Sequence, residues 1–510
     1  MSKTPKFVFG KFLYTALFVA LQIAVIIWAF VYFNERFAFF YAFNVVLSLA
    51  VLLHLIYKNS NPEYKLAWVI PILILPIFGG FLYVVFTHNR STEKMKKMVR
   101  KIDNTFSRSL KSENQVGRQL KTQDADAYLQ SQYISNTTHS VISNNTATKY
   151  LPTGEAFFES VLDDLKNAKK FIFLEYFIIE QGVMWDSIYE ILKQKVKQGI
   201  EVRVMYDDFG CMFKLPQNFS RQLEKDGIKV HVFHKFTNIL SPTFNNRDHR
   251  KILVIDGIVG YCGGINLADE YINVKKPFGH WKDTAVRLYG GAVFNLTMMF
   301  LSIWDCMKNE KTDNYLTYAP SKEIVENIKS DGFVHPYSDI PLDEFEVSKS
   351  VYINMINKAK KYIYITTPYL IIDNTLIEAL TLAALNGVDV KIITPHIPDH
   401  KYVHMITRSY YDVLIKSGVK IYEYTPGFIH SKTFVCDDEY AIVGTVNLDF
   451  RSLYLHYECA VWFYKSSVVK EVFKDFLLTQ AKCQEITSIK KRPLVVRIAI
   501  SILKAFAPLL

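Results

Sequence analysis

The feature that most constrains this chain is an internal duplication. Three short stretches of the first half recur in the same order in the second half, at a separation of roughly 180 to 190 residues. A period this long is too large for a solenoid repeat and indicates a duplicated domain. The matched stretches are NAKKFIFLEYFII (167–179) with KAKKYIYITTPYLII (358–372), QGIEVRVMYDD (198–208) with NGVDVKIITPH (386–396), and KDGIKVHVF (225–233) with KSGVKIYEY (416–424).

The order of elements within each copy indicates an α/β fold. Short apolar runs such as FIFLEYFII and IEVRVMYDD alternate with a longer stretch of helical character, MWDSIYEILKQKVKQG. This alternation predicts largely parallel or mixed sheets flanked by helices. At 510 residues the chain also exceeds the size at which one compact core usually divides. We therefore expect two similar domains, at 151–330 and 331–490, related by a pseudo-twofold axis.

The most distinctive polar residues stand at equivalent places in the two copies. Each copy contains the pattern HxKxxxxD, in DHRKILVID and again in IHSKTFVCD, followed by a glycine turn and an asparagine. Chance gives roughly 0.05 such matches in a chain of this composition, so two matches in register indicate a shared function. The candidate site residues are His249, Lys251, Asp256 and Asn266 in the first copy, and His430, Lys432, Asp437 and Asn447 in the second.

One such motif alone also has a purely structural interpretation. In isolation, FIHSKTFVCDD fits a buried strand whose histidine has a hydrogen-bonding partner and whose lysine extends outward. The second copy favours a composite site instead. Alternate residues of a strand share a face, so each motif histidine projects together with its lysine. If the domains pack about the pseudo-twofold axis, both pairs converge on one positive pocket that suits a phosphate.

Two imidazoles facing one phosphorus atom predict a division of roles. One neutral histidine attacks and forms a phosphohistidine, while the other donates a proton to the leaving alcohol and later accepts one. The lysines and asparagines stabilise the charge on the non-bridging oxygens. This chemistry requires neither a metal nor a cofactor. The six cysteines are scattered without zinc-binding or disulfide spacing, which indicates buried residues in a reducing compartment.

Carboxylates are expected to complete the site. An acid on the far nitrogen of each imidazole would fix its tautomer, and Asp283 in HWKDT and Glu458 in LYLHYEC are the candidates. The alternative is that both are ordinary surface or strand-end acids. The motif residues Asp256 and Asp437 are expected to anchor the turn after the strand rather than to contact substrate.

The first 90 residues predict a membrane anchor. Three stretches of about 20 residues, at 12–33, 37–57 and 66–86, contain no Asp, Glu, Lys or Arg, and each is long enough to span a bilayer as a helix. The alternative, burial of all three in a protein core, is disfavoured because nothing amphipathic separates them from water. The sequence therefore predicts a multi-pass protein of the cell membrane.

Residues 91–150 are expected to form a basic juxtamembrane segment and a linker, since Lys and Arg cluster up to residue 101 and a Ser-, Thr- and Asn-rich stretch follows. The cluster attracts anionic lipids and favours a cytoplasmic active site. Basic residues at the N-terminus favour the same side, which three complete spans cannot satisfy. Either one of the three segments is re-entrant, or one of the two basic clusters does not mark the cytoplasmic side. Residues 491–510 predict an amphipathic interfacial helix, with a packed terminal helix as the alternative.

The paired motifs and several stretches around them resemble sequences of the phospholipase D superfamily, and within it those of the bacterial cardiolipin synthases. The paired motifs carry the wider resemblance, while GGINLADEY, WKDT, YEYTPGFIHSK, GTVNLDFRS and the N-terminal segments carry the narrower one. The resemblance implies duplicated phospholipase D-type domains preceded by transmembrane helices. It also implies phosphatidyl transfer between two phosphatidylglycerol molecules, giving cardiolipin and glycerol. In that reaction His249 is the nucleophile and His430 the acid and base.

The chain departs from this family at two places. His456 stands where the family usually has asparagine, and Asp248 stands where it often has asparagine. The expected partners are phosphatidylglycerol, as donor and acceptor, and anionic membrane lipids, with no nucleic acid; a homo-oligomer is compatible with the sequence. The alternatives are a hydrolytic phospholipase D that releases phosphatidic acid, a nuclease, and a non-catalytic lipid-binding scaffold. Intact motifs in both halves argue against the scaffold.

Overall fold

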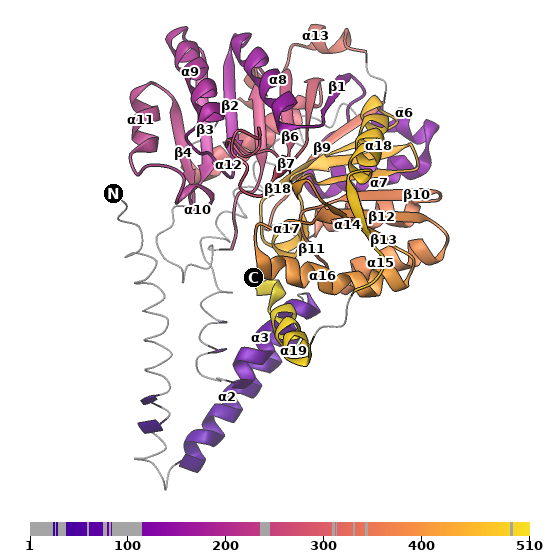
Figure 1. Cartoon of the computed structure of the whole chain (residues 1–510). Coiled ribbons are helices and arrows are strands. Elements are labelled where there is room, and N and C mark those ends of the chain that lie inside the picture. The colour runs from indigo at the N-terminus through magenta and orange to yellow at the C-terminus, as the bar shows by residue number, and fades with distance from the viewer. Residues whose placement is uncertain are drawn as a thin grey trace. The chain divides into compact units, whose positions relative to one another are not determined.

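The structure is a computed structural model of the 510-residue chain, and its elements group into two units that are described separately. The larger unit comprises residues 91–235 and 245–500, and the smaller comprises 1–90, 236–244 and 501–510 (Figure 1). The described residues are 24–25, 27–28, 37–58, 61–74, 79–80, 83, 115–234, 245–308, 312, 314–329, 332–341, 345–489 and 493–509.

The first half of the larger unit is built on a seven-stranded mixed sheet. Its strand order is β1-β8-β6-β5-β2-β3-β4, in which β2, β3 and β4 run parallel and the other pairings are antiparallel. The strands with apolar sequences are buried on both faces, as expected for a sheet covered by helices. They are β1 (Thr146–Leu151), β2 (Phe171–Tyr176), β3 (Glu201–Asp207), β4 (Lys229–Phe233), β5 (Lys251–Ile255), β6 (Val259–Gly263) and β8 (Ala285–Gly290).

The second half repeats this sheet and adds one strand. Its order is β9-β18-β16-β15-β10-β12-β13-β19, so each strand of the first sheet has a counterpart and β19 lies at the edge. The expected duplication and the mixed sheets are confirmed. The strands are β9 (Phe333–Asp339), β10 (Tyr362–Thr366), β12 (Asp389–Pro395), β13 (Lys420–Tyr424), β15 (Thr433–Cys436), β16 (Tyr440–Gly444), β18 (Glu458–Tyr464) and β19 (Cys483–Ile486).

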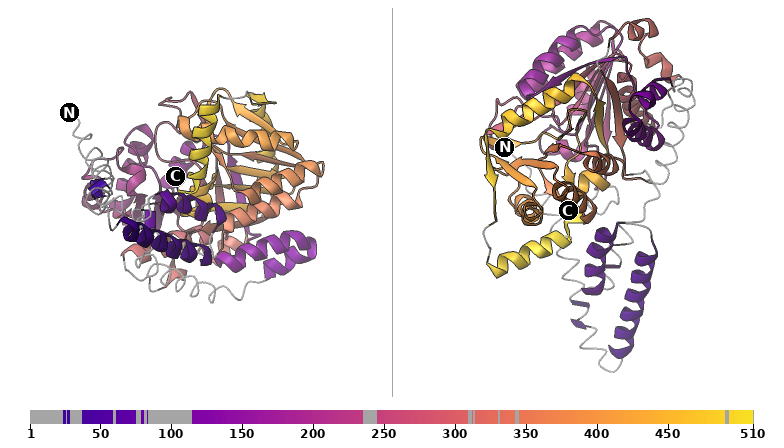
Figure 2. Two further views of the ribbon diagram at one scale, coloured as in Figure 1. Left: turned by 90° about the horizontal axis from the view of Figure 1, so that it is seen from below. Right: turned by 90° about the vertical axis from the view of Figure 1, so that its right-hand side faces the viewer.

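Helices cover both sheets and join the halves through one core (Figures 1 and 2). Helix α12 (Val293–Lys308) of the first half contacts β9 of the second, and helix α18 (Ser467–Gln480) of the second half contacts β1 of the first. A single buried cluster includes Phe173 and Phe300 from the first half with Tyr364 and Phe476 from the second. The main helices are α8 (Gly154–Lys166), α9 (Val183–Lys197), α11 (Phe219–Lys225), α12 (Val293–Lys308), α14 (Val347–Lys358), α15 (Asn374–Leu385), α16 (Lys401–Lys416) and α18 (Ser467–Gln480).

The prediction of a linker is wrong for residues 115–150. They form α6 (Gln115–Gln123), α7 (Ala125–Thr138) and most of the first strand, β1. Several of their apolar side chains, Leu120, Ala127 and Ile134, are completely buried, whereas Leu129 is exposed. The side chain of Asp124 caps α7 by accepting a hydrogen bond from the amide of Ala127. The polar composition concealed this order because only a few residues face the core. Residues 91–114, including most of the basic cluster, lie outside the described part of the chain.

In the smaller unit, α2 (Phe37–Tyr57) coincides with the second expected span and α3 (Pro62–Ile74) with part of the third. Leu55, Trp68, Ile72 and Tyr83 form a buried cluster. Most of the expected span at 12–33 lies outside the described residues. Within the described ranges no helix combines the length and apolar character that crossing a membrane requires, so the multi-pass prediction is not confirmed.

The C-terminal segment forms helix α19 (Leu494–Ala505), followed by the short η3 (Ala507–Leu509). Leu494, Ile498 and Ile502, spaced four residues apart, are more than half exposed, as is Val495. Residues four apart lie on one face of a helix, so α19 presents an exposed apolar stripe.

Candidate active site

The first motif histidine is positioned by main-chain contacts with the other half of the larger unit. His249 lies two residues before the start of β5, and its amide donates to the carbonyl of Tyr457 over 2.9 Å. The amide of Tyr457 donates to the carbonyl of Arg247 over 2.8 Å. This pairing fixes the chain before β5 against the chain before β18. His249 therefore lies directly opposite Glu458, the first residue of β18.

The second motif histidine is positioned in the reciprocal way. Strand β14 (Gly427–Ile429) pairs in parallel with β7 (His280–Lys282), and the amide of His430 donates to the carbonyl of Lys282 over 2.7 Å. His430 thus lies beside Asp283, the residue that follows β7 in the first half. Each histidine reaches its place through backbone supplied by the other half.

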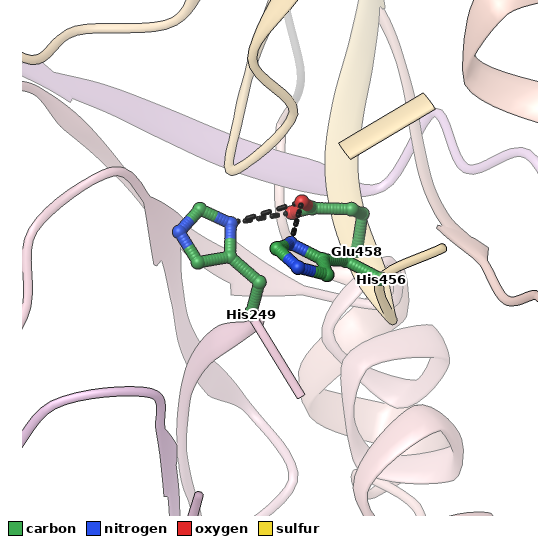
Figure 3. A group of neighbouring side chains, drawn as sticks. All are labelled: His249, His456 and Glu458. Atoms are coloured by element: carbon green, nitrogen blue, oxygen red, sulfur yellow. Dashed lines mark hydrogen bonds and ion pairs between the residues drawn. The ribbon is translucent and has the colours of Figure 1, made fainter. Parts of the chain in front are cut away.

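The two carboxylates are consequently exchanged between the halves. Nδ1 of His249 lies 2.9 and 3.0 Å from the two carboxylate oxygens of Glu458 (Figure 3). Nδ1 of His430 lies 2.6 Å from Oδ2 of Asp283. Both acids are completely buried. An ionised carboxylate only accepts hydrogen bonds, so each Nδ1 donates and each neutral ring keeps its lone pair on Nε2.

Burial sets the charge state of both imidazoles. It lowers the pKa of His249 to about 3, partly opposed by the charge of Glu458. It also lowers the pKa of His430 well below the usual range, assisted by the charges of Lys432 and Lys251. Both rings are therefore neutral at physiological pH in the free protein.

The two carboxylates respond to their surroundings in opposite directions. Burial raises the pKa of Asp283 to about 7, despite the opposing charge of Lys432. Burial is the largest single influence on the pKa of Glu458 and acts to raise it, but the interactions with His249 and His456 together outweigh burial and the net shift is downward. Glu458 additionally accepts a hydrogen bond from the hydroxyl of Thr445. Glu458 is thus held as an anion, whereas Asp283 can take up a proton near neutrality.

The motif lysines are buried beside the histidines. Lys251 and Lys432 are 2% and 1% exposed, and the ammonium of each donates to the main-chain carbonyl of its own motif histidine. Burial lowers the pKa of Lys251 to about 8 and that of Lys432 to about 7. The charge of Lys251 acts on His430 as well as on Lys432, so the two motifs belong to one electrostatic site. Two such ammonium groups suit a bound phosphate.

Aromatic side chains line the site. The ring of His249 lies 5.1 Å from that of Phe177, and the ring of His430 lies 5.5 Å from Trp281 and 5.6 Å from Tyr271, between ring centroids. These rings shield the imidazoles from water. Reduced solvation strengthens every charge interaction with a phosphate bound there.

The two motif asparagines differ in their hydrogen bonds. Oδ1 of Asn266 accepts from the amide of Ile178, and its amide group donates to the hydroxyl of Tyr271, so this side chain supports the surrounding loops. Asn447 is buried as well, and within the described residues its Oδ1 has no hydrogen-bonding partner. The expected contact of both asparagines with a phosphate stays a prediction.

The motif aspartates lie at the opposite end of their strands from the histidines. Asp256 accepts hydrogen bonds from the amides of Lys169, Lys170 and Phe171. Asp437 accepts the equivalent three from Lys360, Lys361 and Tyr362. Their φ angles of 54° and 53° lie in the left-handed region, which aspartate tolerates better than most residues. Both therefore hold a turn against the start of the neighbouring strand.

A third imidazole, which the sequence analysis left without a role, also lies at this site. Nδ1 of His456 is 3.7 Å from Oε1 of Glu458, and its ring centroid is 5.5 Å from that of His249 (Figure 3). His456 stands two positions before Glu458, the spacing of neighbours on one face of an extended chain. Ligand-capable atoms of His249, His456 and Glu458 all lie within 4.8 Å of one another. Sequence spacing could not reveal this group, because His249 and Glu458 are 209 residues apart.

Comparisons with known families agree with the duplicated architecture. The family described as cardiolipin synthase, PLD-like domain, matches residues 161–276 and again 352–478. The phospholipase D-nuclease N-terminal family matches residues 46–86. The two matches of the first family cover the two halves and include both HxKxxxxD motifs.

Individual relatives resemble nearly the whole chain. The cardiolipin synthase of Alkalihalophilus pseudofirmus is 34% identical over 92% of this chain and 93% of its own length. The major cardiolipin synthase of Bacillus subtilis is 33% identical, covering 91% of this chain and 98% of that protein. Among solved structures, the phosphatidylserine synthase of Haemophilus influenzae shares the fold with a TM-score of 0.54. It has 16% identity and covers 75% of this chain and 98% of that one.

Proposed function

Because the chain belongs to the bacterial cardiolipin synthases of the phospholipase D superfamily, and is an enzyme of that type, we propose a specific reaction for it. It transfers the phosphatidyl group of one phosphatidylglycerol molecule to the terminal hydroxyl of a second, forming cardiolipin and glycerol. The observation that carries this proposal is the crossed pair of buried histidine–carboxylate contacts, one contributed in each direction between the halves.

In the first step, the Nε2 lone pair of His249 attacks the phosphorus of bound phosphatidylglycerol. The phosphorus–nitrogen bond forms as the bond to the glycerol oxygen breaks, and His430 gives that oxygen its proton. The free protein keeps His430 neutral, but an anionic phosphodiester beside it favours the protonated ring. Lys251 and Lys432 bind the non-bridging oxygens and stabilise the charge that develops on them.

In the second step, the terminal hydroxyl of another phosphatidylglycerol attacks the phosphatidyl–His249 intermediate. His430, now neutral, accepts the hydroxyl proton while the phosphorus–nitrogen bond breaks. Cardiolipin leaves, His249 regains its lone pair and His430 is protonated for the next cycle. Every proton given in the first step is recovered in the second.

The two carboxylates support this assignment of roles. Glu458 remains an anion, so it keeps the Nδ1 proton of His249 in place and stabilises the positive ring of the intermediate. Asp283, whose pKa burial raises to about 7, can share a proton with His430 near neutrality. A histidine that must gain and lose a proton in each cycle benefits from such a partner.

We place the enzyme at the cell membrane, as a multi-pass protein with its site on the cytoplasmic side. The exposed apolar stripe of α19 supports contact with a bilayer surface, and the basic residues up to residue 101 support attraction to anionic lipids. Donor and acceptor would both enter from that surface. Residues 151–330 and 331–490 are proposed as the two domains that build the site together.

The test is product analysis with the purified full-length protein in vesicles of phosphatidylglycerol. Cardiolipin and glycerol in equal amounts are expected. Phosphatidic acid with no cardiolipin would identify a hydrolase in which water replaces the lipid alcohol. No turnover by a folded protein would favour the non-catalytic scaffold. The His249→Asn variant is the matched control, because it keeps a polar side chain of similar size and lacks a nucleophilic ring nitrogen.

A further inference from the structure

His249, His456 and Glu458 form a compact group of ligand-capable side chains, here called the His–His–Glu cluster (Figure 3). We propose that this cluster is an inhibitory binding site for a divalent transition metal ion, with Zn²⁺ as the best match. The binding itself is independent of the proposed reaction, whereas the inhibition rests on His249 being the nucleophile of that reaction.

The separations of the ligand atoms fit a zinc ion. Nδ1 of His249 lies 2.9 Å from Oε1 of Glu458, and Nδ1 of His456 lies 3.7 Å from the same oxygen. Zinc bonds of about 2.0–2.1 Å in tetrahedral geometry place neighbouring ligand atoms about 3.3 Å apart. One measured separation is slightly shorter than this value and the other slightly longer. The ligand atoms of the two histidines also lie within 4.8 Å of each other, so side-chain rotations that bring the rings closer together would let all three atoms bind one ion, with a fourth position left for water.

Nδ1 of His456 is available to a metal ion, and the hydrogen bond from Nδ1 of His249 to Glu458 is the one that an ion would replace. Within the described residues, Nδ1 of His456 is buried without a hydrogen-bonding partner, and its side chain is only 11% exposed. Oε2 of Glu458 is bound by the hydroxyl of Thr445, which orients the carboxylate and leaves Oε1 facing both rings. Metal-binding carboxylates are commonly oriented by outer hydrogen bonds of this kind. A metal ion would satisfy the buried nitrogen that the protein does not.

The donor set selects the type of metal. Two imidazoles and one carboxylate suit Zn²⁺ and similar transition metals, whereas Mg²⁺ and Ca²⁺ prefer oxygen ligands. The buried ammonium of Lys251 repels a dication, since its charge is felt by the same carboxylate. Only a metal that forms strong bonds to nitrogen overcomes this repulsion. Mg²⁺ is therefore expected to bind the cluster poorly.

Metal binding would block the nucleophile through its tautomer. In the metal-free site, Nδ1 of His249 donates its proton to Glu458 and the lone pair remains on Nε2. When Nδ1 bonds to the metal, the proton of the neutral ring resides on Nε2 instead. Nε2 then has no lone pair with which to attack phosphorus. The same ion also removes Glu458 from its role as the partner of His249.

Direct metal binding is the first test, and it does not depend on activity. The purified full-length protein is dialysed against Zn²⁺ and the bound metal measured, with His456→Asn as the matched variant. About one ion per chain is expected for the native protein. Binding to the variant should be weaker by about tenfold or more, since even the loss of an outer-shell partner costs 10–100-fold. Equal affinities in the two proteins would overturn the site.

Inhibition is the second test, measured as cardiolipin formation with and without Zn²⁺. The native enzyme should lose activity as the site fills and regain it with a chelator, while Mg²⁺ at the same concentration has little effect. The His456→Asn enzyme should be much less sensitive to Zn²⁺. Equal sensitivity of both proteins, or stimulation by Zn²⁺, would contradict the proposal. If neither protein forms cardiolipin, the proposed function fails and the binding measurement still decides whether the site exists.

Discussion

The two histidine sites share a construction and differ in chemistry. Each motif histidine precedes a central strand, receives a main-chain contact from the other half and directs Nδ1 at a buried carboxylate. Glu458 meets its ring with both oxygens, accepts a further bond from Thr445 and has a lowered pKa. Asp283 meets its ring with one oxygen and has a pKa raised to about 7. The two halves thus share the backbone arrangement around the histidine, whereas the paired acids differ in their hydrogen bonds and in the direction of their pKa shifts.

The largest expected effects come from replacing each histidine by alanine. His249→Ala and His430→Ala should each lower kcat with phosphatidylglycerol by on the order of 10⁴–10⁶. A donor with an acidic phenol as leaving group separates them, because that group departs without a proton. His430→Ala should then give one rapid burst of phenol per chain, and His249→Ala none. A burst from the His249 variant would reverse the assigned roles.

The paired acids provide the next comparison. Glu458→Gln removes the charge that fixes the Nδ1 proton of His249, a type of change that costs up to about 10⁴ in kcat. Asp283→Asn should cost less, about 10²-fold, and should alter the pH profile, since it removes a group with a pKa near 7. Steady-state kinetics from pH 5 to 9 compare the two. Equal losses with unchanged profiles would show that the acids do not differ in function.

The lowered pKa values of the two motif lysines predict how the activity of the enzyme falls at alkaline pH. Lys432 and Lys251 are charged below pKa values of about 7 and about 8, so the free enzyme loses positive charge as the pH rises through this range. kcat/KM, which reports the free enzyme, should fall about tenfold for each pH unit above the controlling pKa. Lys432→Arg stays charged, so its alkaline decline should begin at higher pH even if its activity is lower. An unshifted decline would exclude Lys432 as the controlling group.

The smallest effects on chemistry are expected at the motif aspartates. Asp256→Ala and Asp437→Ala each leave three backbone amides without their carboxylate, which should lower stability by about 2 kcal/mol. Thermal denaturation should show similar losses for the two, with kcat largely retained well below the transition. Asn at either position is the milder control, because it tolerates positive φ. A large loss of kcat without a loss of stability would place these residues in the reaction.

Local patterns predicted the duplicated fold and singled out the candidate residues of the site. The repeated strand–helix–strand order indicated two α/β halves, and the recurring motif identified His249 and His430. The sequence could not show that Glu458 serves the histidine of the first half and Asp283 that of the second, because this exchange depends on how the halves pack. His456 was visible only as a departure from asparagine. Its proximity to His249 comes from contacts between segments about 200 residues apart.

The order of residues 115–150 was missed for a different reason. Secondary structure there depends on a few apolar residues such as Leu120 and Ile134, and on contacts with the second half, including the hydroxyl of Tyr464 with Asp124. A polar segment that gains its stability from distant partners carries little local periodicity. The same dependence on distant contacts therefore explains both the missed helices and the unseen pairing of the acids.

The most direct test of the central claim is to trap the covalent intermediate. The His430→Ala protein is incubated with the phenol-leaving donor, quenched without acid to preserve the phosphorus–nitrogen bond, digested and analysed by mass spectrometry. The account predicts a phosphatidyl group on the peptide that contains His249, and none in the His249→Ala control. A phosphatidyl group on any other residue, or burst kinetics with no modified peptide, would contradict it.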